Sequence, residues 1–301
     1  MLMIAALLVS VGAFSEPELP QGFSSQRQLL GINLLLILLP PYFLVAWGLS
    51  LRRSVRLLGE VDALLGSDEF AGAALTPAKF LVLGAVIGLL YAVAFNIPVA
   101  TVGELLGGGA LLVCVVLLII VVWATAGLVL ASRLHTASVF RHAGRRVPVD
   151  AYEVTPLEPF ARSGMGDVVV VIGALVLATV QSIDAMFRYE NYFYTMIVAV
   201  PAALVLLLLP MQTLHVRLKD MKQREMAAVR DTIRAMPKTL TADNTAALET
   251  MLRRRDRIEA LATWPMNVAM ISRLVFYGVI PPAAWVGAAL VERLVGQILE
   301  N

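Results

Sequence analysis

The chain has 301 residues, of which 59% are hydrophobic and only 15% are charged, and its formal net charge is +2. Soluble domains carry about 25% charged residues, so this composition excludes an ordinary water-soluble globular protein. The single cysteine, Cys114, excludes a disulfide or a cysteine-based metal site within one chain. The preference for Arg over Lys favours a prokaryotic source with a GC-rich genome.

Six stretches without a charged side chain predict membrane helices. They cover residues 28–51, 80–103, 105–132, 168–183, 191–216 and 274–291. A helix needs about 20 residues to cross a hydrocarbon core of about 30 Å. The fourth stretch has only 16 residues and must borrow flanking ones. We therefore predict an all-α, polytopic bundle of six membrane helices in a lipid bilayer.

The basic residues are sorted to alternate connections of this bundle. Of the 24 Lys and Arg, 21 fall in residues 52–79, 133–166 and 211–273. Basic loops stay on the cytosolic side of a membrane, so these segments are predicted to be cytosolic, with the C-terminus outside. This topology predicts a plasma (inner) membrane protein. It also explains the basic residues without a nucleic-acid partner.

Residues 1–28 comprise an apolar segment that ends near Phe14 and a polar outer tail. The Val11-x-Ala13 sequence resembles a signal-peptide cleavage site, but no basic region precedes the apolar segment. Two alternatives stay open: a signal peptide, or a short retained helix that would be the seventh.

Residues 29–210 hold the first five predicted membrane helices. The first, 29–51, has Pro40 and Pro41 at its midpoint, and an interior proline removes a helix hydrogen bond and kinks the helix. The few polar candidates for a pore wall include Asn33 in this helix and Asn96 in the second. Residues 57–75 predict a short amphipathic helix along the membrane surface.

Small residues recur four apart in the second and third predicted helices, 76–99 and 110–132. The pairs are Gly84 with Gly88, and Gly127 with Ala131. Such spacing allows close approach of helices in lipid. We interpret it as packing within the chain, with a dimerisation face as the alternative.

A Gly164-Met165-Gly166-Asp167 sequence precedes the fourth predicted helix, 168–187. It resembles the Gly-x-Gly-Asp motif of intramembrane aspartyl proteases and is most similar to that of prepilin peptidases, which implies a catalytic role for Asp167. The resemblance covers four residues, and Val169 replaces the Lys of those peptidases. No second aspartate lies in an uncharged stretch to share a proton. We therefore interpret Asp167 as a helix cap, with the glycines shaping the turn.

Residues 211–273 predict a cytosolic antiparallel helical hairpin between the fifth helix, 192–209, and the sixth. Apolar residues recur at helical spacing in both of its halves, at Met226, Val229, Ile233 and Met236 and at Leu248, Met251, Ile258 and Leu261. A basic face on the second half is a candidate interaction surface and consists of Arg253, Arg254, Arg255 and Arg257.

The segment 274–301 contains the sixth membrane helix and repeats the Pro-Pro feature at Pro281 and Pro282. No histidine has a second ligand at metal-binding spacing. We expect no catalytic residue, no cofactor and no metal site, and thus no enzyme.

Two functions remain. The first is an oligomeric, channel-like or passive transport protein: its proline-containing helices would expose carbonyl groups to a pore, and its hairpin would assemble or gate a homo-oligomer. The alternative is a non-enzymatic signalling or scaffold protein whose basic hairpin binds a protein partner or anionic lipid. The uncharged stretches disfavour a proton-coupled carrier, which usually carries ionisable groups at mid-membrane.

Overall fold

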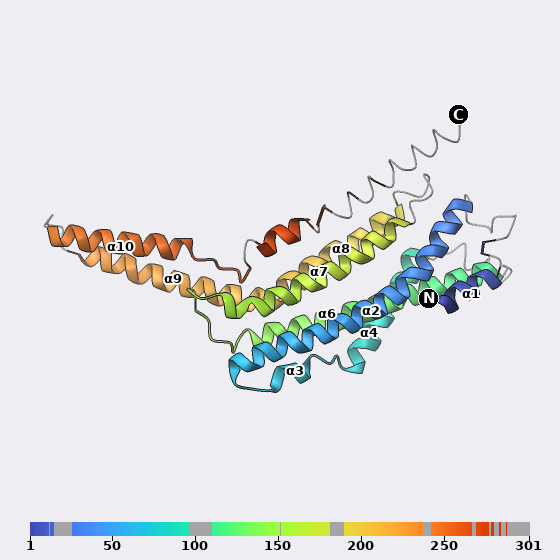
Figure 1. Ribbon diagram of the computed structural model, residues 1–301, viewed down its shortest axis with the longest axis horizontal. Helices are drawn as coiled ribbons and strands as arrows, with labels where there is room; N and C mark the ends of the chain where they lie inside the picture. The colour runs from blue at the N-terminus through green and yellow to red at the C-terminus, as the bar shows by residue number, and fades with distance from the viewer. Residues whose placement is uncertain are drawn as a thin grey trace, which may run out of the picture.

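The structure is a computed structural model and consists of long helices laid roughly along one axis (Figure 1). It describes residues 1–11, 13–14, 26–96, 110–150, 152–180, 190–236, 242–266 and 269–276, together with Gly278, Val279, Ala283 and Gly287. These residues form helices and turns, with no strand among them. The all-α prediction is confirmed for this part of the chain.

Five helical stretches of the described chain are long and apolar enough to cross a membrane. They involve α2 (Gln26–Leu65), α4 (Ala78–Tyr91) with its π-helical extension η1 (Ala92–Asn96), α6 (Ala110–Ala143), α7 (Glu158–Ala178) and α8 (Glu190–Leu208). Most of the sixth predicted helix, including Pro281 and Pro282, lies outside the described residues.

Three of these helices extend well past the charged residues that were predicted to end them. α2 continues to Leu65, so the prediction of a separate surface helix at 57–75 is wrong. α6 continues ten residues beyond Arg133, and α7 begins ten residues before Val168. The length of an uncharged stretch therefore underestimates the length of each of these helices, because the helical extensions bury further apolar side chains.

Those extensions meet in one apolar cluster, the basal core. It combines side chains of α2, α3 (Glu69–Ala73), α6, α7 and the start of α9 (Gln212–Ala235). Its fully buried members include Leu58, Phe70, Phe140, Phe160 and Leu214. The three segments that hold most of the Lys and Arg therefore pack against one another at one end of the bundle.

A second apolar cluster lies among α1 (Leu2–Ser10), α2 and α6. Leu8 of α1 is fully buried, and it packs in this cluster with Leu36 and Val115. Figure 1 shows α1 at the end of the molecule opposite α10. The N-terminal apolar segment thus forms a short helix on the bundle, and its cleavage as a signal peptide stays a prediction.

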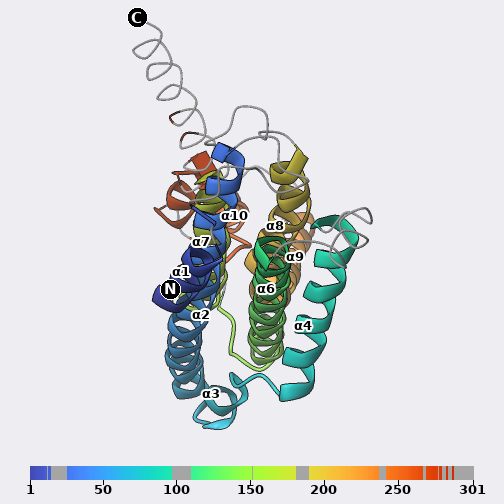
Figure 2. The same ribbon diagram turned by 90° about the vertical axis from the view of Figure 1, so that its right-hand side faces the viewer.

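α4 lies beside α6 (Figure 2), and the two helices pack closely where glycines face each other. A Cβ atom on Gly84 would lie 2.5 Å from both the Gly127 carbonyl oxygen and the Ala131 Cβ. A Cβ on Gly88 would lie less than 3.0 Å from the Trp123 carbonyl oxygen, closer than real Cβ atoms approach. The small residues singled out in the sequence thus face each other within one chain.

The last membrane-length helix does not stop at the basic residues that follow it. α8 passes through a single 3₁₀ turn, η5 (Leu209–Met211), directly into α9. α10 (Ala242–Ala260) lies beside α9, and the pair projects beyond the rest of the molecule (Figure 1). Val229 and Ile258 are buried in this α9–α10 hairpin, with exposures of 2% and 0%.

Candidate functional site

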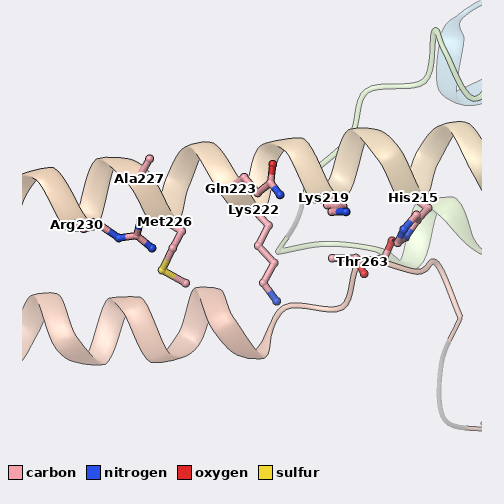
Figure 3. A pocket seen from close by; sticks show the side chains of 8 residues that line it. All are labelled: His215, Lys219, Lys222, Gln223, Met226, Ala227, Arg230 and Thr263. Carbon is pink, nitrogen blue, oxygen red and sulfur yellow. The ribbon is translucent and has the colours of Figure 1, made fainter.

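An open groove of about 520 Å³ lies between α9 and the chain that follows the end of α10 (Figure 3). One row of α9 side chains lines it together with a residue from beyond α10. The lining residues are His215, Lys219, Lys222, Gln223, Met226, Ala227, Arg230 and Thr263. The lining therefore includes three basic side chains and a histidine but no acidic one.

Lys222 and His215 hold the two walls of this groove together. The Lys222 ammonium donates to the carbonyl oxygens of Glu259 at 2.6 Å and Leu261 at 3.0 Å. Carbonyls at a helix C-terminus lack intrahelical partners and attract cations, so Lys222 caps α10 from its neighbour. His215 places Nδ1 3.0 Å from the Thr263 carbonyl oxygen and stacks on Trp264 with ring centroids 4.1 Å apart.

Two further cations line the groove. Lys219 and Arg230 are exposed, and neither forms an ion pair with a described residue. The sequence analysis missed this groove, although a signal existed. The positions 215, 219, 222, 226 and 230 recur at helical spacing along one face of α9.

The arginine run of the second hairpin helix lies on the surface of α10. Three of its members have acidic neighbours: Arg253 pairs with Glu249 at 2.5 Å, Arg254 with Glu225 at 2.9 Å, and Arg255 with Asp256 at 3.1 Å. Exposed ion pairs of this kind contribute about 0–1 kcal/mol each. They can therefore be exchanged for a partner's carboxylates at little cost.

A buried ion pair joins α6 to α7. Arg133 Nε donates to Asp167 Oδ1 at 2.8 Å, and both side chains are 3% exposed. Arg133 Nη2 also donates to Ser54 Oγ of α2 at 2.8 Å, whereas its Nη1 has no partner in the part of the chain that the structure describes. The charges that act on Asp167 come from Arg133 and Arg53. The pair thus fastens three helices together.

The interpretation of Asp167 as a helix cap is wrong. Asp167 lies in the interior of α7, which begins at Glu158. The neighbouring glycines also serve packing instead of a turn. A Cβ on Gly164 would lie 2.7 Å from the Leu207 carbonyl oxygen of α8, and one on Gly166 would overlap the Arg53 guanidinium.

The structure describes the side chains of three of the candidate pore residues, Asn33, Pro40 and Pro41, and all three lie on α2. Pro40 and Pro41 lie inside α2, where the Tyr42 hydroxyl donates to the Val170 carbonyl oxygen of α7 at 2.7 Å. Asn33 is fully buried and donates to the Ala13 carbonyl oxygen at 3.2 Å. The side chain of Asn96 lies outside the described residues.

Comparison of the chain with known protein families, with curated proteins and with solved structures finds no match. The fold by itself defines an all-helical protein with several helices compatible with a membrane location.

Proposed function

We propose that this chain is a multi-pass membrane scaffold or signalling protein whose α9–α10 hairpin docks an acidic protein partner. The observation that carries the proposal is the continuity of α8 with α9 through η5. A membrane-length helix thereby extends directly into the projecting hairpin (Figure 1). The bundle acts as the base, and the hairpin is the working surface.

The charge of the hairpin segment supports an acidic partner. Residues 211–273 contain 12 Lys and Arg but only 7 Asp and Glu, whereas the whole chain has a net charge of +2. Complementary charge speeds association and fixes orientation. The positive-inside rule places this basic segment in the cytosol, where the basal core joins it to the other two basic segments.

The test removes the basic face of α10. The full chain is cross-linked in its own membrane and purified, and a partner present at about one copy per chain is titrated against variants. Replacement of Arg253, Arg254 and Arg255 by Gln is expected to weaken binding roughly tenfold, since exposed charge pairs contribute about 0.5 kcal/mol each.

The matched control replaces three exposed arginines of the bundle, Arg56, Arg141 and Arg145, by Gln. This control removes the same charge and is expected to leave binding unchanged. Absence of a stoichiometric partner, or equal weakening by both triple variants, would reject the proposal.

The channel hypothesis stays a prediction. Its described proline pair lies next to Tyr42, which packs on α7 where Gly173 leaves room for the ring. Purified protein in planar bilayers tests it directly, because a channel must give ionic current at some voltage polarity.

A further inference from the structure

The exposed face of α8 carries an apolar stripe that no described residue covers. Ile197, Val200, Leu204 and Leu208 are 40–52% exposed. Their spacing of three or four residues places them on one helix face. Such a stripe on a membrane-length helix suits the acyl chains of lipid.

α9, which continues α8 through η5, carries the cations of the groove close to the same face. His215, Lys219 and Lys222 follow the stripe at helical spacing after η5. The 3₁₀ turn winds each residue about 20° further than an α-helix does, or about 60° over its three residues. The basic row therefore stays within about a quarter turn of the apolar stripe.

The distance of each cation along the helix axis shows which end of the groove lies nearer the membrane interface. With a rise of 2.0 Å for each residue of η5 and 1.5 Å for each residue of α9, His215 lies about 12 Å and Lys219 about 18 Å beyond Leu208. The headgroup region of each leaflet is about 5–8 Å thick, and the flexible stem of a lysine reaches back toward the helix N-terminus and the interface. Arg230 lies about 22 Å beyond His215 and is out of reach of this region.

We infer that the membrane end of the groove binds the headgroup of an anionic phospholipid whose acyl chains lie along the α8 stripe. The phosphate accepts from Lys219, which has no ion pair with a described residue. Lys222 has one N–H left after its bonds to the two α10 carbonyls. The inference rests on the membrane placement proposed above but not on a protein partner at α10.

The test is native mass spectrometry of the purified full chain, titrated with phosphatidylglycerol and, separately, with phosphatidylcholine. Phosphatidylglycerol is expected to saturate a site of one lipid per chain at lower concentration than phosphatidylcholine. Lys219→Gln is expected to weaken this binding about fivefold, which corresponds to about 1 kcal/mol per basic residue near an anionic surface. Arg224→Gln, which removes an exposed positive charge from α9 outside the groove lining, is the matched control and leaves the affinity unchanged.

Equal affinity for the two lipids, or no effect of Lys219→Gln, would overturn the inference. A third titration adds glycerol phosphate to the lipid-bound protein. Displacement of the lipid by this soluble compound would show that the groove binds a free phosphate ligand instead. The Arg253, Arg254 and Arg255 triple variant should keep its lipid affinity. Failure of the partner proposal is thereby distinguishable from failure of this one.

Discussion

At the scale of single residues, the Arg133–Asp167 pair is the contact with the largest expected effect on stability. The two residues are 34 positions apart, and in the sequence each marks the end of an uncharged stretch. Their pairing depends on how α6 packs on α7, which local sequence does not specify. Sequence could place both charges at the same membrane boundary but could not predict that they touch.

Arg133→Met is expected to destabilise the protein by about 3–5 kcal/mol, because it leaves the Asp167 carboxylate buried without its cation. The double variant Arg133→Met/Asp167→Leu should recover most of this loss, since apolar residues of similar volume replace a buried pair well. The measurement is denaturant unfolding in detergent, followed by circular dichroism.

Arg234→Met is the control, because its pair with Asp231 is 3.8 Å long and its side chain is 73% exposed. It should change the free energy of unfolding by less than about 1 kcal/mol. A cost for Arg133→Met as small as that of the control would contradict the structural role of the pair.

At the scale of elements, the order of the helices and the small-residue positions followed from the sequence, whereas several helix ends did not. The sequence predicts helix ends at charged residues such as Arg52 and Arg133. They mark the edge of the apolar stretch, but the backbone continues as helix because Leu58, Phe140 and Phe160 are buried in the basal core beyond it. Hydropathy reports the membrane boundary, and the helix boundary is set by packing.

The glycine packing of α4 on α6 predicts an asymmetric response to added methyl groups. Gly88→Ala forces a Cβ into the Trp123 carbonyl oxygen and should destabilise the protein by about 1–3 kcal/mol, the usual cost of overpacking. Gly48→Ala, with nothing within 4 Å of its Cβ, should be neutral or stabilise α2 by up to about 1 kcal/mol. Thermal unfolding of both variants in the same detergent compares them, and equal midpoints would contradict the close packing.

At the scale of the whole molecule, the sorting of arginines and the basal core agree on which segments lie together. The sequence grouped 52–79, 133–166 and 211–273 by charge, and the structure packs parts of all three into one core. The sequence did not predict the groove between α9 and the chain that follows α10. The apolar seam of α9 predicts that two helices pair, but it does not show which basic side chains line the space beside them.

Single cysteines introduced into a Cys114→Ser background test the membrane orientation. Positions Ser67, Asp150 and Lys238 should be protected from a membrane-impermeant maleimide applied to intact cells, because the positive-inside rule assigns their segments to the cytosol. Gly103 and Tyr189, in the predicted outer connections, should be labelled. Permeabilised cells provide the control, in which all five positions should react. Labelling of Ser67, Asp150 or Lys238 in intact cells would contradict the proposed orientation.

The unbroken passage from α8 into α9 also has a mechanical consequence. α9 contains 24 residues and is about 36 Å long. A change of about 10° in the tilt of α8, well inside the range that membrane helices show, would swing Ala235 sideways by about 6 Å if the rod stays straight. A stiff arm of this kind converts a slight reorientation inside the bilayer into a displacement as large as a side chain at its far tip.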